Sequence, residues 1–125
     1  MKTEQDQVKE FMLKAGQECP EKPVIPGINV HVLRIDLIQE ELNELDTALG
    51  NEDIIEVADA ITDLLVVVLG TAVACGINIQ PCWDEVHRSN MTKFIDGHRR
   101  EDGKWIKGPS YSPANLEPII KEQMK

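Results

Sequence analysis

The chain has 125 residues, of which 42% are hydrophobic and 28% charged, so it is long enough to bury a core without disulfide bonds. Thirteen basic against 22 acidic side chains give a net charge of −9, and only 4% of the residues are aromatic. This balance argues against nucleic acid or an anionic membrane as a partner, because both are bound through basic surface.

The cysteines and the apolar stretches indicate a compartment. Cys19, Cys75 and Cys82 are odd in number and lack metal-binding spacing, so we expect free thiols in a reducing environment. The N-terminus is charged and does not resemble a signal peptide. The longest apolar stretch, 64–75, is shorter than the ~20 residues that span a bilayer. We therefore expect a cytoplasmic protein.

Hydrophobic periodicity predicts four helices joined by short connections. Asn29 is suited to the N-cap of the second helix and Pro81 to the first turn of the fourth, while Gly16, Gly50 and Gly76 can end the first three. The region between the first two helices holds three prolines and should be a loop. The predicted helices cover about 3–15, 29–49, 51–75 and 81–94.

The last thirty residues differ from the helical part. A short hairpin can form around Asp102-Gly103, and the remainder should be irregular. We therefore predict an all-α fold: one domain over 1–125, with a four- to five-helix bundle over about 1–94 and a tail over about 95–125.

The third predicted helix is apolar on almost every side, which is typical of a central, buried helix. It nevertheless contains acidic side chains, which fall within one stripe about 60° wide: Glu52, Glu56, Asp59 and Asp63. Buried carboxylates are costly unless a cation neutralises them. So apolar a helix also predicts at least a homodimer, in which a second copy covers its far side.

The second predicted helix carries Glu40, Glu41 and Glu44 beside its apolar face. If the tight Gly50-Asn51 connection makes the two helices antiparallel, the carboxylates of both should converge at one height. An all-oxygen cluster suits Mg²⁺, with Mn²⁺ as the alternative, and needs no His or Cys, which points away from zinc and copper. Mg²⁺ keeps positions open for phosphate oxygens, so a nucleoside triphosphate is the expected ligand.

Two readings of this acidic pattern remain open at this point. In the first, the carboxylates hold a catalytic metal. In the second, they form a structural acidic stripe on a non-catalytic helical dimer module, since glutamate-rich helix surfaces are common.

The two acidic motifs, Glu40-Glu41-x-x-Glu44 and Glu56-x-x-Asp59, resemble the EExxE…ExxD signature of the all-α nucleoside triphosphate pyrophosphohydrolases. These form the MazG-like and phosphoribosyl-ATP pyrophosphatase-like superfamily. Further blocks at 85–93 and 102–111 extend the resemblance over nearly the whole chain. It implies Mg²⁺-dependent cleavage of an NTP or dNTP between the α- and β-phosphates, which yields NMP and pyrophosphate, in a homodimer or homotetramer.

The resemblance also implies site residues. The metal ligands would be Glu41, Glu44, Glu56 and Asp59. Glu40 would orient the attacking water or hold an additional Mg²⁺, and Asn90 and Lys93 would belong to the active site. Asp63 is a candidate outer-shell partner of a ligand or a partner for the N-terminal helix. Segment 86–111 has a net charge of +3 against −12 for 1–85, so further candidates for phosphate contacts are Arg88, Lys104, Lys107 and Tyr111.

Overall fold

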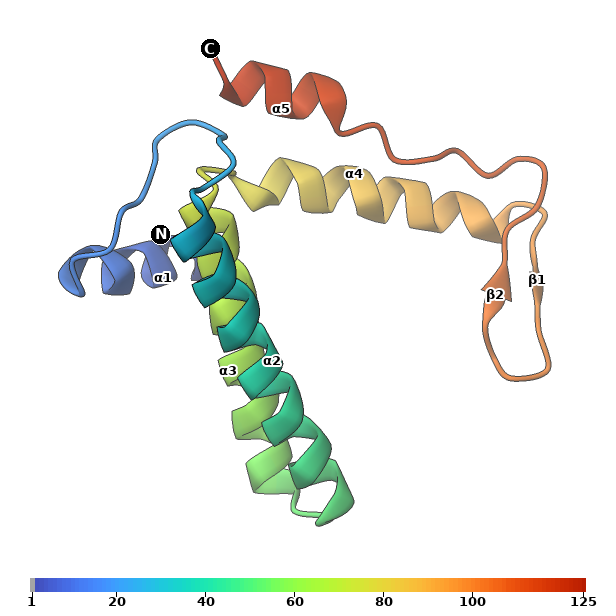
Figure 1. The fold of residues 1–125 in the computed structure, drawn as a ribbon. Helices are drawn as coiled ribbons and strands as arrows, with labels where there is room; N and C mark the ends of the chain where they lie inside the picture. Colours follow the sequence, from blue (N-terminus) through green and yellow to red (C-terminus); the bar gives the residue numbers. More distant parts are fainter. Residues whose placement is uncertain (1) are drawn as a thin grey trace. The chain divides into compact units, whose positions relative to one another are not determined.

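The computed structural model describes residues 2–125, and its helices confirm the all-α prediction (Figure 1). A single two-stranded hairpin is the β-structure of this described part. The elements are α1 (Glu4–Lys14), α2 (Ile28–Gly50), α3 (Ile54–Ala74), α4 (Ile79–Met91), the 3-10 turn η1 (Thr92–Phe94), β1 (His98–Arg99), β2 (Trp105–Ile106) and α5 (Glu117–Gln123). Two compact units meet at Ile77 and Asn78, and each is described by itself.

The helix starts follow local capping chemistry. Asp53 caps α3 by accepting hydrogen bonds from the backbone N–H groups of Ile55 and Glu56, and Asn78 caps α4 through Gln80. The second helix begins one residue before the Asn29 predicted as its cap. Gly27 takes the extended cap conformation instead, without a side-chain hydrogen bond. Because the chain is already extended at Gly27, the helical turn can begin directly after it.

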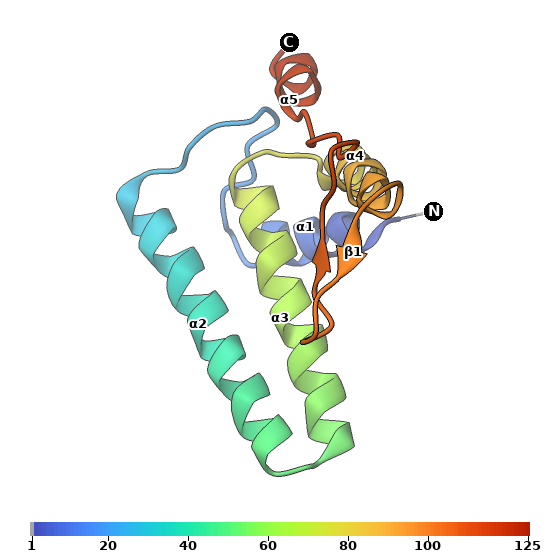
Figure 2. The same ribbon diagram turned by 90° about the vertical axis from the view of Figure 1, so that its right-hand side faces the viewer.

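The long helices α2 and α3 run antiparallel and side by side (Figures 1 and 2). Ala48, Val57 and Ala60 are buried along this pair, and the small side chains of the two alanines allow close approach of the two backbones. Glu52 in the connecting turn has φ 54°, which reverses the chain within three residues between the helices.

A buried arginine joins α2 to α3 nearer the other end of the pair. Arg34 is 5% exposed and donates hydrogen bonds to the Val67 carbonyl at 2.9 Å and to Thr71 Oγ1 at 3.3 Å. Burial lowers the pKa of this guanidinium. Gly70 makes room for it, because a Cβ there would lie 2.3 Å from an Arg34 nitrogen.

The core of the first unit forms where α1 packs against the C-terminal part of α3. Val8 and Met12 of α1 are buried against Val73 and Ala74 of α3. The proline-containing loop closes over this end, since the Val24 N–H donates to the Cys75 carbonyl. The first unit is therefore a helical hairpin with a third helix at one end.

Much of the apolar surface of α2 and α3 is uncovered in one chain. Ile54 and Ile55 are each 77% exposed, and Leu65 is 57% exposed. By length and composition alone α3 could cross a membrane, a test that core helices of soluble proteins also pass, and 28% of the relevant stretch is buried within the described chain. The central, fully buried helix expected from the sequence is thus not achieved by a single copy.

The second unit is organised around α4 and the predicted hairpin. β1 pairs antiparallel with β2, with His98 opposite Ile106 and Arg99 opposite Trp105. Gly103 has φ 91° in the turn between the strands, where L side chains rarely fit. The tail returns along α4, because the Ser89 hydroxyl donates to the Ser112 carbonyl.

Candidate active site

The acidic side chains of α2 and α3 come together near the middle of the helical hairpin. Glu41 and Glu44 lie one turn apart on α2, and Asp63 faces them from α3. One carboxylate oxygen from each residue lies within 4.8 Å of the others. These three residues are called the acidic cluster below. Three negative charges at this spacing repel one another strongly in the absence of a cation.

The environment of Glu41 reflects that repulsion. Its Oε2 atom is buried and finds no hydrogen-bond partner among residues 2–125. The pKa of Glu41 is raised to about 7, first by burial, then by the hydrogen bond and charge of Glu44, and last by the charges of Asp63 and Glu40. A buried oxygen without a donor, in an all-carboxylate set, is suited to a hard divalent cation.

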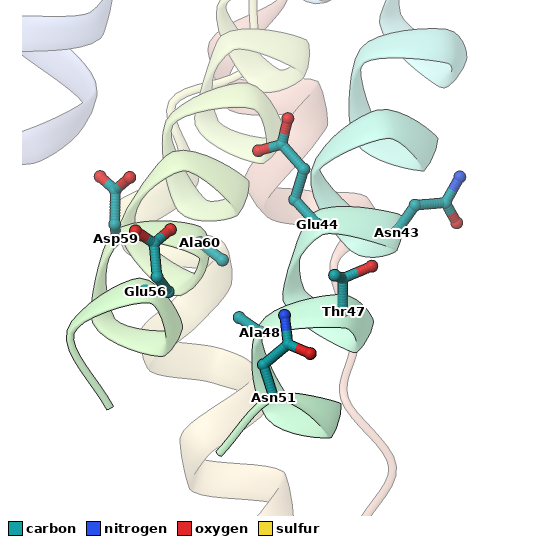
Figure 3. Close-up of a pocket in the computed structure, with 8 residues that line it drawn as sticks. All are labelled: Asn43, Glu44, Thr47, Ala48, Asn51, Glu56, Asp59 and Ala60. Atoms are coloured by element: carbon teal, nitrogen blue, oxygen red, sulfur yellow. The ribbon is translucent and has the colours of Figure 1, made fainter. Parts of the chain in front are cut away.

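A pocket of about 360 Å³ between α2 and α3 adjoins the acidic cluster at Glu44. Figure 3 shows Glu44 extending from α2 toward α3, with Glu56 and Asp59 on the α3 side and Asn43 directed away. This interhelical pocket is lined by Asn43, Glu44, Thr47, Ala48, Asn51, Glu56, Asp59 and Ala60.

The structure therefore arranges the predicted carboxylates in two groups that share Glu44. Glu41 and Glu44 gather with Asp63, for which the sequence predicts an outer-shell role or a contact with the N-terminal helix. Glu56 and Asp59 are exposed on the wall of the interhelical pocket. Glu40 is exposed on α2, and its charge still raises the pKa of its neighbour Glu41.

Two polar residues of the interhelical pocket were not singled out from the sequence. Thr47 and Asn51 follow Glu44 by three and seven residues, so all three lie on one helical face. That spacing could have identified them. Their uncharged oxygens and the Asn51 amide can hydrogen-bond a ligand without adding further negative charge.

The comparison with protein families bears on what this arrangement does. Residues 8–90 match the sequence model of a family described as phosphoribosyl-ATP pyrophosphohydrolase. The chain belongs to the phosphoribosyl-ATP pyrophosphohydrolase family. The matched segment contains the acidic cluster and the interhelical pocket. A comparison with curated proteins gave no match.

Membership confirms the predicted superfamily and implies a hydrolase of pyrophosphohydrolase type, which acts on phosphoric anhydrides. Members of the family typically depend on a divalent metal, and the acidic cluster offers three carboxylates to one. The all-carboxylate set of oxygens and the Glu41 oxygen without a hydrogen-bond partner among the described residues both fit such an ion. Glu41, Glu44 and Asp63 are the residues that would hold it, with Glu56 and Asp59 available across the interhelical pocket.

The match to the phosphoribosyl-ATP pyrophosphohydrolase family ends at Asn90. The site residues predicted after α3 all lie in the second unit. Arg88 lies inside the match, Asn90 is its last residue, and the others follow it. The structure brings four of them around one pocket of about 310 Å³. This lysine pocket is lined by Lys93, Lys104, Trp105, Ile106, Lys107 and Tyr111.

Arg88 and Asn90 do not line the lysine pocket. Arg88 donates to both carboxylate oxygens of Glu85, at 2.8 and 3.0 Å, and to Ser112 Oγ at 3.1 Å. The hydrogen bonds from Arg88 and from the Asn115 N–H lower the pKa of Glu85 to about 2. Arg88 thus fastens the tail to α4, while Asn90 is exposed on that helix.

Proposed function

We propose that the chain is a Mg²⁺-dependent nucleoside triphosphate pyrophosphohydrolase that cleaves an NTP or dNTP between its α- and β-phosphates. The observation that carries the proposal is the acidic cluster. It presents three converging carboxylates, and a buried Glu41 oxygen there has no hydrogen-bond donor among the described residues. Family membership supports the class of reaction, which is cleavage of a phosphoric anhydride.

In this proposal the carboxylates have two roles, which are to bind the metal and to activate the attacking water. Glu41, Glu44 and Asp63 would hold the divalent metal, with Glu56 and Asp59 as further candidate ligands. The metal, when bound, neutralises phosphate charge and lowers the pKa of a coordinated water. Glu40 lies next to Glu41, is exposed, and is assigned to orient the attacking water and accept its proton.

The proposed reaction is a single in-line displacement. The water oxygen forms a bond to the α-phosphorus, and the bond from that phosphorus to the bridging oxygen breaks. The bridging oxygen keeps the electron pair and leaves with pyrophosphate, whose added negative charge requires a cationic partner. Lysines of the second unit are assigned that role, with Lys93 closest in sequence to the family match.

A panel of canonical and modified NTPs and dNTPs, with detection of pyrophosphate, tests this function. We expect release of pyrophosphate and NMP with Mg²⁺ and none with EDTA, and loss of turnover in Asp59→Asn. Release of orthophosphate in place of pyrophosphate, or equal turnover in EDTA, contradicts the proposal. Absence of turnover of any nucleotide, together with a melting temperature that Mg²⁺ does not raise, would favour the structural acidic stripe instead.

The exposed apolar surface supports a second part of the proposal, which is that the chain works as a homodimer or homotetramer. Ile54, Ile55, Leu65 and Leu42 are all at least 46% exposed, and an apolar surface of this extent on a soluble protein is normally covered by a partner. Light scattering coupled to size exclusion should give two or four chains. A monomer at micromolar concentration contradicts it.

A further inference from the structure

The interhelical pocket runs from the acidic cluster toward the turn that joins α2 to α3. Glu44 belongs to both the cluster and the pocket, and Asn51 lines the pocket at the C-terminal end of α2. Asn51 follows Glu44 by seven residues, which is two helical turns or about 10 Å along the axis. A ligand that is held by a phosphate at the acidic cluster can therefore extend along the pocket to Asn51.

Small side chains on both helices make room for such a ligand. Ala48 and Ala60 are buried and line the pocket from α2 and α3. Their methyl groups add apolar surface to a space of about 360 Å³ that carboxylates and uncharged polar groups also line. An apolar surface with a few polar groups at its edge is typical of small-molecule sites, and it suits a flat ring better than a free ion.

Asn51 supplies the amide of this pocket. Three of the lining residues are carboxylates, which accept hydrogen bonds but cannot donate them when ionised. Asn43 has a second amide, but it is directed away from the pocket (Figure 3), and its Oδ1 accepts a hydrogen bond from Gln39 at 2.9 Å. The Asn51 side chain extends from the turn toward Thr47 and Ala48 in the same view. This side chain forms no hydrogen bond within residues 2–125.

The turn between the helices does not require an asparagine at position 51. The Asn51 backbone N–H closes the helix by donating to the Thr47 carbonyl at 3.0 Å, and every residue except proline has that group. Its φ of −83° and ψ of −4° lie in the right-handed helical region, which is open to all L residues. The left-handed conformation, which favours asparagine, falls on Glu52 instead. The local backbone thus leaves the choice of this side chain unexplained, and a ligand contact explains it.

The edge of a nucleobase presents the pattern that a carboxamide complements. Asn51 offers an acceptor oxygen and N–H donors in one plane, and base edges place a donor beside an acceptor in the same way. A phosphate group offers acceptors alone, and the neighbouring Glu56 and Asp59 repel it unless a cation intervenes. An uncharged, planar group with both donors and acceptors therefore fits the Asn51 end of the pocket best.

We propose that Asn51 is a specificity-determining residue that hydrogen-bonds the edge of the substrate's nucleobase. This inference rests on the proposed function, in which the α-phosphate is attacked beside the acidic cluster. The base packs on the methyl groups of Ala48 and Ala60, and the amide selects among bases by their pattern of donors and acceptors. The metal and its carboxylates act on the triphosphate, which all these nucleotides share, so they do not discriminate between bases.

Hydrolysis of the four NTPs and the four dNTPs by Asn51→Leu tests the assignment. This variant keeps a side chain of similar size and removes the amide. We expect the ratio of kcat/KM between the best and the worst base to fall at least about tenfold, chiefly through a higher KM for the best base, as for loss of a bidentate base contact. The half-saturating Mg²⁺ concentration should stay at its wild-type value.

Asn51→Asp provides a second readout that loss of structure cannot imitate. It replaces the amide donors by a second acceptor, so the order of preference should shift toward bases that present an N–H donor at that point. Asn29→Leu, at an exposed position of α2 outside the pocket, is the matched control and should keep the wild-type ratios. Equal base ratios in wild type and in both Asn51 variants overturn the proposal, and so do equal kcat/KM values for all bases in wild type. Circular dichroism with thermal melting verifies that each variant folds.

Binding separates this assignment from the proposed function. The α,β-methylene analogues of ATP, CTP, GTP and UTP have no bridging oxygen between the α- and β-phosphates, so calorimetry in Mg²⁺ measures their affinity without cleavage. If no nucleotide is hydrolysed yet the analogues bind with a base preference that Asn51→Leu removes, the proposed function fails and the assignment stands. If nucleotides are hydrolysed with the same base ratios in wild type and Asn51→Leu, the assignment fails and the function stands. If no analogue binds and no nucleotide is hydrolysed, both fail.

Discussion

The acidic cluster and the lysine pocket each concentrate charge, and the two charges are of opposite sign. Each gathers three like charges that the described chain leaves uncompensated, the first on two long helices and the second on a hairpin and its return loop. The unit that holds the acidic cluster has 5 basic and 15 acidic side chains, against 8 and 7 in the other unit. Each region is costly when empty, because its like charges repel one another.

The two regions also differ in how burial acts. Glu41 is half-buried, and one of its carboxylate oxygens has no hydrogen-bond partner among the described residues. Its negative charge therefore strongly affects the stability of the folded chain. Lys104 and Lys107 are exposed, so water screens their mutual repulsion. Substitutions in the acidic cluster should therefore change both activity and stability, whereas substitutions in the lysine pocket should change ligand binding alone.

The largest expected effect is that of Glu41→Gln. Removal of a charged metal ligand should reduce pyrophosphate release at least about a hundredfold. In EDTA the same variant should melt at the wild-type temperature or higher, because one of three repelling charges is gone. Steady-state kinetics and calorimetric melting measure the two effects. The exposed Glu18→Gln is the control, and a Glu41→Gln enzyme with wild-type turnover would remove the acidic cluster from the mechanism.

Asp63→Asn should have the next largest effect, since Asp63 completes the acidic cluster from α3. We expect the Mg²⁺ concentration for half-maximal activity to rise about tenfold or more, with a smaller change in activity at saturating Mg²⁺. A magnesium titration of pyrophosphate release measures this, with the exposed Asp46→Asn as the control. If half-saturation is unchanged, Asp63 serves the packing of α3 and not the metal.

The stability of the metal-free chain should fall as the pH rises. The folded state keeps the Glu41 proton up to about pH 7, whereas an unperturbed glutamate releases it near 4.5. Between these values the folded state binds more protons than the unfolded state, so raising the pH favours unfolding. Urea denaturation in EDTA across this range should show the decline, and Glu41→Gln should flatten it. An equal decline in the variant would assign the effect to other groups.

The smallest effect is expected at Glu85, which responds to pH with the opposite sign. Its folded-state pKa of about 2 lies below the ordinary 4.5, so its stabilising effect is complete above 4.5 and is lost as the pH falls toward 2. Glu85→Gln should reduce stability slightly at neutral pH and weaken the acid transition of the second unit. Carboxyl chemical shifts from NMR measure that pKa, with Glu122→Gln as the control. A value near 4.5 would show that the Arg88 pair does not persist in solution.

The sequence predicts the helices well because their apolar periodicity is strong and their ends carry turn and capping residues. Periodicity also places Asp63 on the acidic stripe of α3, but it does not say which carboxylates meet. That depends on the alignment of α2 against α3, which is set by the turn at Glu52 and by the contact of small residues such as Ala48 and Ala60.

The sequence analysis names the lysines and the tyrosine of the lysine pocket as candidate site residues, but it does not predict that they line one pocket. Its lysines become neighbours because Tyr111 returns beside the end of α4, through hydrogen bonds such as that from the Ser112 N–H to Thr92 Oγ1. No short-range pattern specifies such a return, so composition indicated the charge and tertiary structure supplied the pocket.

Two apolar helices in a hairpin could in principle slide past each other by one turn, and Arg34 prevents this. If the pair shifted, the Arg34 guanidinium would lose its hydrogen bonds to the Val67 carbonyl and to Thr71 Oγ1. A buried cation would then have no hydrogen-bond acceptors. Glu41 lies two turns along α2 from Arg34, and Asp63 lies two turns back along α3 from Thr71. Arg34 therefore fixes the alignment of α2 against α3, and the convergence of the carboxylates two turns away depends on that alignment.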